Sequence, residues 1–152
     1  MKKIFFIIIA SLFFASCLKT QQGCQPLKPE SEASQINAYC TANNITPTID
    51  PSGIYYQIIN SGMGAAPTLN SKITISYIAK FTSDAAVDSS ITPYTNYLKN
   101  LIPGWQIALP LIKKGGRIKM VVPSSLAYGC TGYQNVPPNA ILYFDVFLLD
   151  VQ

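Results

Sequence analysis

The sequence contains no histidine, and this absence excludes several common kinds of active site. Ser-His-Asp and Cys-His catalysis, HExxH zinc sites and histidine pH switches all need that side chain. No CxxC pair is present either, so a cysteine metal site lacks its usual ligand spacing. Charged residues are also scarce, at 12% against 49% hydrophobic residues. With 152 residues, the composition predicts one folded domain rather than a disordered chain.

The N-terminal hydrophobic stretch is too short to cross a membrane. Lys2 and Lys3 precede an apolar run over 4–15, whereas a spanning helix needs about 20 apolar residues. A basic start, a short apolar region and small residues before a cysteine are typical of a cleaved export signal. We therefore predict a signal peptide over 1–16, removed before Cys17.

The residues around the expected cleavage site suggest a lipid anchor. Phe14-Ala15-Ser16-Cys17 resembles the lipobox of bacterial lipoproteins, which implies acyl chains on the sulfur and the amine of Cys17. More than one acyl chain gives stable membrane anchoring. The expected location is the cell envelope, either the periplasmic face of the outer membrane or the cell surface. The alternative is an ordinary secreted protein with an incidental cysteine at this position.

The remaining charge gives no sign of a nucleic-acid partner. Loss of the two lysines of the signal peptide lowers the formal net charge from +4 to about +2. One basic cluster, Lys113, Lys114, Arg117 and Lys119, surrounds Gly115-Gly116. We interpret it as a solvated turn leading into a strand, with a phosphate-binding patch as the alternative.

Three cysteines besides Cys17 would be exported with the chain. Disulfides persist in oxidising compartments, so Cys24, Cys40 and Cys130 predict one disulfide and one remaining thiol. The sequence does not assign the pairing. No metal site and no cofactor are expected.

Hydrophobic periodicity predicts an α+β fold. Residues 17–29 are polar and form a tether, and 30–51 contain a short helix and a linker, with the helix pattern beginning at Pro29. A second helix begins at Pro103 and is limited by Pro110. Apolar or alternating patterns predict four strands, over 53–59, 72–81, 116–122 and 140–151, the last of them central or covered. Together these elements predict a twisted antiparallel sheet wrapped on one short helix, with a short helix before it.

Several motifs together resemble the FKBP-type peptidyl-prolyl cis-trans isomerases. These are VDSS at 87–90, LIPGWQIALPLIKKGGRIKMVVPSSLAYG at 101–129 and NVPPNAILYFDVFLLDV at 135–151, in the order and spacing of the family. The segment in front of them is similar to the approach found in bacterial extracytoplasmic members. The resemblance implies an FKBP domain over 52–152 with an apolar proline pocket between sheet and helix.

The resemblance also assigns residues to that pocket. Trp105 would form its floor, Asp88 would be the pocket carboxylate, and Tyr128 would donate a hydrogen bond to the substrate carbonyl. The alternative for Tyr128 is that it merely packs a strand end. The walls and substrate contacts would come from Tyr77, Val87, Tyr94, Leu101, Ile102, Ala127, Tyr133, Val136 and Phe144.

This sequence departs from the family pattern around the pocket. Val87 replaces a common Phe, Tyr133 stands where some members have His, and Ala79 occupies a typical Gly position. The loop expected after Ser90 is several residues shorter than usual and contains no basic partner for Asp88 before Lys99. These changes predict a wider, more polar rim and weak affinity for macrolide inhibitors.

The function implied is isomerisation of Xaa-Pro bonds in exported proteins by a membrane-anchored folding catalyst. Its partners would be proline-containing unfolded proteins and the membrane, and the chain would be a monomer. The alternative is a non-catalytic FKBP-like module at the cell envelope that binds peptides or proteins. Both alternatives need the same fold, so the sequence does not separate them.

Overall fold

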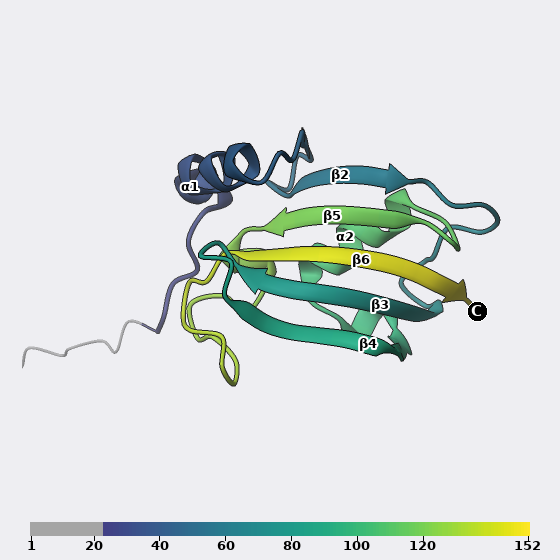
Figure 1. Ribbon diagram of the computed structural model, residues 1–152. Coiled ribbons are helices and arrows are strands. Elements are labelled where there is room, and N and C mark those ends of the chain that lie inside the picture. Colours follow the sequence, from purple (N-terminus) through teal and green to yellow (C-terminus); the bar gives the residue numbers. More distant parts are fainter. Residues whose placement is uncertain (1–22) are drawn as a thin grey trace, which may run out of the picture.

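The computed structural model describes residues 23–152, which form an antiparallel sheet with helices on both of its faces (Figure 1). The predicted signal peptide, Cys17 and residues 17–22 of the predicted tether lie outside the described residues. The elements in chain order are α1 (Pro29–Ala42), β1 (Thr48–Ile49), β2 (Tyr55–Asn60), β3 (Lys72–Phe81), β4 (Ala86–Tyr97), η1 (Leu98–Asn100), α2 (Pro103–Ala108), η2 (Leu109–Leu111), β5 (Arg117–Val122), η3 (Ser124–Leu126) and β6 (Leu142–Val151).

The sheet has six strands in the order β1-β2-β5-β6-β3-β4, and all neighbouring strands are antiparallel. Strand β6 lies between β5 and β3, as its run of apolar residues predicted. The α+β class, the short covering helix and the N-terminal helix are confirmed. No helix in the described part of the chain is long and apolar enough to cross a membrane.

The main hydrophobic core lies between the sheet and α2. Successive side chains of a strand point to opposite faces, so alternate residues of β6, among them Phe144 and Val146, enter this core. Helix α2 begins with Pro103, whose missing N–H is not needed in the first turn. A Cβ on Gly104 would lie 2.5 Å from Cγ1 of Val122, so only glycine lets α2 pack this closely on β5.

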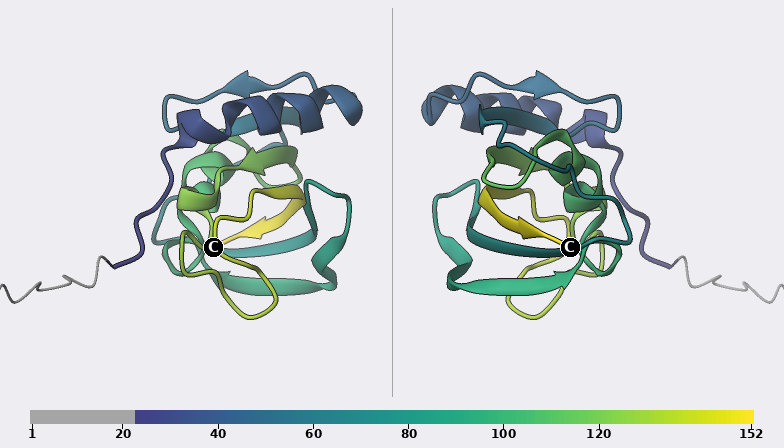
Figure 2. Two further views of the ribbon diagram at one scale, coloured as in Figure 1. Left: turned by 90° about the vertical axis from the view of Figure 1, so that its left-hand side faces the viewer. Right: turned by 90° about the vertical axis from the view of Figure 1, so that its right-hand side faces the viewer.

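A second, smaller core lies on the opposite face of the sheet, under α1. Figure 2 shows α1 running along the outside of the domain beside β2. Ile36 and Tyr39, the apolar residues that predicted this helix, are both buried here. Tyr39 packs on Tyr143 of β6, with 5.6 Å between ring centroids. Helix α1 is thus part of the folded unit.

Strand β4 was not predicted. The prediction of a loop after Ser90 is wrong, because the strand continues to Tyr97. Tyr77 pairs with Ser90 and Ile75 pairs with Tyr94, so 91–93 form a bulge within a continuous strand. Proline is tolerated at a bulge or at a sheet edge because no ladder donor is needed there, and Pro93 lies in both. The sheet therefore extends alongside the region where the sequence places the pocket.

The basic cluster lies around the turn before β5, in agreement with its interpretation as a turn leading into a strand. Lys114 Nζ lies 2.6 Å from a carboxylate oxygen of Asp150, and Arg117 makes two hydrogen bonds to Asp145. Half of the cluster is therefore paired with carboxylates, which speaks against a phosphate-binding patch.

Candidate active site

A cavity of about 330 Å³ opens between α2 and strands β3, β4 and β6. It is mostly apolar, with hydroxyl groups and one carboxylate at its rim. Most of the residues predicted for the pocket are brought together here. Its lining consists of Tyr77, Ala79, Val87, Asp88, Tyr94, Asn100, Leu101, Ile102, Trp105, Tyr128, Tyr133, Leu142 and Phe144.

Three aromatic rings from three elements form the floor of the cavity. Trp105, in the first turn of α2, is only 5% exposed. Its ring meets Tyr77 of β3 edge-on at 5.1 Å between centroids, and Phe144 of β6 at 5.2 Å. Edge-to-face pairs at these distances are favourable because the positive edge of one ring meets the negative face of another. The floor is therefore aromatic and closely packed, with Trp105 and Phe144 buried in it.

Asp88 lies on β4 at the rim of the cavity and is held by hydrogen bonds. The Tyr77 hydroxyl donates to Oδ2 at 2.5 Å, and the Ser89 amide donates to Oδ1 at 2.8 Å. No basic side chain of the described residues lies within ion-pair distance of this carboxylate. Burial, followed by the hydrogen bond to Asp88, raises the pKa of Tyr77 well above its ordinary value. The tyrosine hydroxyl thus takes the place of the basic partner expected from the family.

Tyr128 lies on the turn that follows η3 and lines the opposite side of the cavity. Its ring stacks on Tyr133 with centroids 5.4 Å apart and planes 13° from parallel. Gly129 has a φ of 62°, a left-handed conformation that glycine adopts without steric cost, and so turns the chain directly after Tyr128. Within residues 23–152 the Tyr128 hydroxyl has no hydrogen-bond partner, so it is free to donate to a ligand.

Comparison with known proteins identifies the family. Residues 64–149 match the model of the family described as FKBP-type peptidyl-prolyl cis-trans isomerase. The chain belongs to this family. The recognition made from the sequence motifs is confirmed.

Curated FKBP relatives are longer than this chain. It is 41% identical over 104 residues to the FKBP-type peptidyl-prolyl cis-trans isomerase FkpA of Escherichia coli K12, covering 66% of this chain and 38% of FkpA. It is 36% identical over 126 residues to the peptidyl-prolyl cis-trans isomerase Mip of Coxiella burnetii, covering 79% of this chain and 55% of Mip. The matched region therefore spans less than half the length of FkpA.

The crystal structure of FkpA from Escherichia coli has the same fold. It superposes with a TM-score of 0.73 at 34% identity, over 82% of this chain and 61% of that chain. The structural match covers more of this chain than residues 64–149, which match the family model. This is expected if elements before the FKBP domain also align.

Two residues predicted for the FKBP pocket do not line the cavity. Val136 is 7% exposed and belongs to the main core, and Ala127 packs against that core beside Tyr128. Conversely, Ala79, Asn100 and Leu142 line the cavity although none of them was predicted as a pocket residue. Ala79 could have been found, because it lies two residues after Tyr77 in a predicted strand and so shares the face of the sheet that Tyr77 presents to the cavity.

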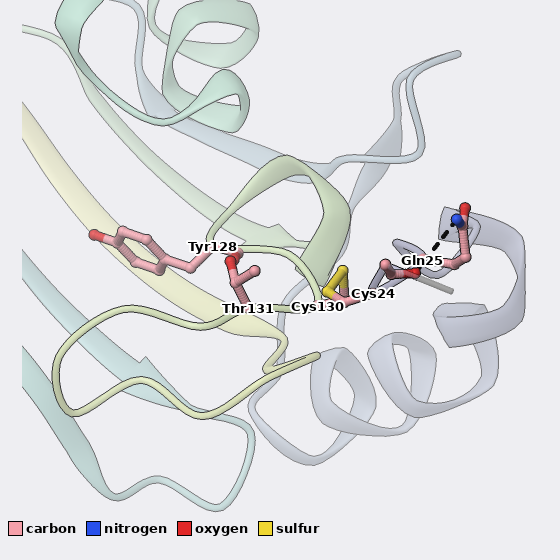
Figure 3. Close-up of a disulfide and its surroundings, with 6 residues drawn as sticks. Cys24, Gln25, Tyr128, Cys130 and Thr131 are labelled. Atoms are coloured by element: carbon pink, nitrogen blue, oxygen red, sulfur yellow. Dashed lines mark hydrogen bonds between the residues drawn. A yellow bond between two sulfur atoms is a disulfide. The ribbon is translucent and has the colours of Figure 1, made fainter. Parts of the chain in front are cut away.

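A disulfide joins the segment before α1 to the loop that carries Tyr128. Cys24 forms a disulfide with Cys130, and Cys40 is a buried thiol. The single disulfide expected from the sequence is present, and its pairing is now assigned. Figure 3 shows Tyr128 and Cys130 on one loop, with the Tyr128 ring pointing away from the sulfur atoms. The bond therefore fixes this loop without entering the cavity.

If the cavity is an isomerase site that uses Tyr128, we expect its activity to be insensitive to pH across the neutral and mildly alkaline range. Burial, then the negative charge of Asp88, raises the pKa of Tyr128 above its ordinary value. The neutral hydroxyl therefore predominates up to at least about pH 10, and it is lost only as the pH rises through the higher folded-state pKa. NMR exchange on an Xaa-Pro peptide, which needs no coupling protease, should give a constant kcat/KM from about pH 7 to about pH 9.5.

The Tyr128→Phe variant is the control for this measurement, because it has no hydroxyl to ionise. A fall in kcat/KM centred below about pH 10 in the unaltered protein, and absent from the variant, would contradict the raised pKa.

Proposed function

We propose that this chain catalyses cis-trans isomerisation of Xaa-Pro bonds. The observation that carries the proposal is the cavity itself, which is lined by packed aromatic rings around Trp105 and by Tyr128, whose hydroxyl has no partner among residues 23–152. Its volume of about 330 Å³ is at the lower end of small-ligand pockets, which suits a proline ring with its flanking amide.

The reaction requires an environment that favours the twisted amide over the planar one. Resonance places charge on the oxygen and nitrogen of the planar amide and gives a rotation barrier of about 18–20 kcal/mol. The twisted transition state has lost much of this charge separation. An apolar floor of Trp105, Tyr77 and Phe144 therefore disfavours the planar state relative to the transition state, which is the differential effect that accelerates a reaction.

Tyr128 would orient the substrate by donating a hydrogen bond to the carbonyl oxygen, without transferring its proton. Asp88 would act indirectly, because its hydrogen bond with Tyr77 fixes one ring of the floor. In this scheme the reaction needs no nucleophile, metal or cofactor, and no general base.

A binding module without catalysis is the second candidate function. The observation that favours it is Val87, which lines the wall with a small side chain where the family commonly has Phe. A wider wall would hold a proline ring less tightly and reduce the discrimination between planar and twisted amides. The same widening leads us to propose weak binding of macrolide inhibitors.

We propose that the chain acts on exported proteins as a lipid-anchored monomer of the cell envelope. The support is the leader over 1–16, the lipobox ending at Cys17, and the Cys24–Cys130 disulfide, which is typical of an oxidising compartment. The proposed organisation is a tether over 17–29, a helix and linker over 30–51, and the isomerase domain over 52–152.

The first test is isomerase activity of the chain purified in detergent, with short Xaa-Pro peptides and a slow-refolding protein limited by proline. A double variant, Tyr128→Phe with Asp88→Leu, should lower kcat/KM about tenfold or more, because it removes one transition-state hydrogen bond and the anchor of Tyr77. Tyr97→Phe is the matched control, since Tyr97 is exposed and lies outside the cavity.

Each outcome of this test has a distinct meaning. Activity that is unchanged in the double variant would show that the cavity is not the catalytic site. If the well-folded unaltered chain does not accelerate isomerisation, the isomerase proposal is wrong and the binding module becomes the proposed function.

A further inference from the structure

Helix α1 places a carboxylate in the interior of the protein, far along the chain from the cavity. Glu32 is 6% exposed, and its Oε2 accepts a hydrogen bond from the backbone amide of Ser124 at 2.9 Å, across 92 residues of sequence. A buried carboxylate is costly unless it is hydrogen-bonded or paired. No basic side chain of residues 23–152 lies within ion-pair distance of it, so the Ser124 amide is its identified partner. Burial alone does not explain why a carboxylate, rather than an apolar side chain, occupies this position.

Ser124, the residue whose amide is bound by Glu32, anchors the turn that carries Tyr128. The Ser124 carbonyl accepts hydrogen bonds from the amides of Ala127, at 3.0 Å, and Gly129, at 2.8 Å. These two residues are the immediate neighbours of Tyr128. A short chain of hydrogen bonds therefore runs from the Glu32 carboxylate, through Ser124, to both sides of the tyrosine.

The far end of the same turn is also fixed from the N-terminal segment. Cys130, two residues after Tyr128, is bonded to Cys24, which precedes α1 (Figure 3). Ser124 is fully buried, so without Glu32 its amide would be buried with no acceptor. The turn would then have to shift to expose that amide, and Tyr128 would shift with it.

We propose that Glu32 is a positioning residue for Tyr128. Helix α1 would then contribute to the geometry of the proline site through this side chain. The inference rests on the proposed function of that site. A hydrogen-bond donor serves a transition state only when it is held within about 0.5 Å of the productive geometry. Glu32 contributes to this accuracy without touching the substrate.

The test compares Glu32→Leu, which removes the acceptor, with Glu32→Gln, which retains a neutral one. We expect Glu32→Leu to lower kcat/KM about tenfold at a temperature where circular dichroism shows a folded protein, since small displacements of a catalytic group have effects of this size or larger. Glu32→Gln should recover most of the loss. Glu30→Leu is the matched control, because Glu30 is exposed in the same turn of α1.

A double-mutant cycle with Tyr128→Phe separates positioning from stability. If Glu32 acts through the hydroxyl, Glu32→Leu should change kcat/KM by less than about twofold in the Tyr128→Phe background. An equal loss in both backgrounds, or full activity in folded Glu32→Leu protein, would overturn the proposal. If Glu32→Leu does not fold, Glu32→Asp, which draws the carboxylate back by one methylene, enters the same cycle with the same expectation.

A second readout remains available if the chain binds but does not catalyse. Binding of an Xaa-Pro peptide can be followed by the fluorescence of Trp105, the only tryptophan of the chain. Weaker binding by Glu32→Leu in the unaltered background, but not in the Tyr128→Phe background, would support positioning even without turnover. Equal weakening in both backgrounds would overturn it, whatever the fate of the isomerase proposal.

Discussion

Replacing Trp105 with alanine should lower the free energy of unfolding by about 3–5 kcal/mol, as expected for a large aromatic side chain deleted from a core. Trp105 is 5% exposed and packs edge-on against both Tyr77 and Phe144, so the deletion leaves a void that the rigid sheet fills poorly. Isomerase activity should be lost with it, because the floor of the cavity disappears. Urea unfolding must be followed by circular dichroism, since the variant has no tryptophan.

Trp105→Phe is the matched variant for this experiment. It keeps an aromatic ring on α2 and should lose about half as much stability, because part of the volume remains filled. A free energy of unfolding for Trp105→Ala within about 1 kcal/mol of the unaltered protein would contradict the packing described for the floor.

Removing the disulfide should have an effect of similar size. Replacing Cys24 and Cys130 together with serine should lower the free energy of unfolding by about 2–5 kcal/mol. The bond joins residues 106 apart in sequence and therefore restricts a large part of the unfolded chain. Urea unfolding of the oxidised protein and of the double serine variant measures the difference.

Reduction supplies the control for the disulfide. Adding a reductant should bring the unaltered protein down to the stability of the serine variant and leave the variant unchanged. A peptide map that finds Cys40 in a disulfide, or a stability that does not respond to reduction, would contradict the pairing.

The sequence predicted most of the fold because its elements carry strong local signals. Alternation over 72–81 and the apolar run over 140–151 became β3 and β6, and the prolines at 103 and 110 bounded α2. Strand β4 was missed for a physical reason. As an edge strand with a bulge at 91–93, it has polar exposed residues and a proline, and neither produces strand periodicity.

The residues of the candidate site could be predicted only where they belong to family motifs. The motifs brought Trp105, Asp88 and Tyr128 to one cavity, while their roles stay predictions until activity is measured. The burial of Glu32 could not be foreseen, because glutamate in the first turn of a helix is usually solvated and favours the helix dipole. The pairing of Cys24 with Cys130 depends on contacts across the whole fold, and cysteine spacing does not encode it.

The disulfide also sets how far the domain can stand from a membrane. If Cys17 carries lipid as proposed, the first covalently fixed point of the fold is Cys24, and only 18–23 lie between them. A fully extended chain of that length reaches at most about 25 Å. In the oxidised protein the loop bearing Tyr128 would then be held close to the lipid headgroups, and reduction of the disulfide would lengthen the flexible segment between this loop and the membrane.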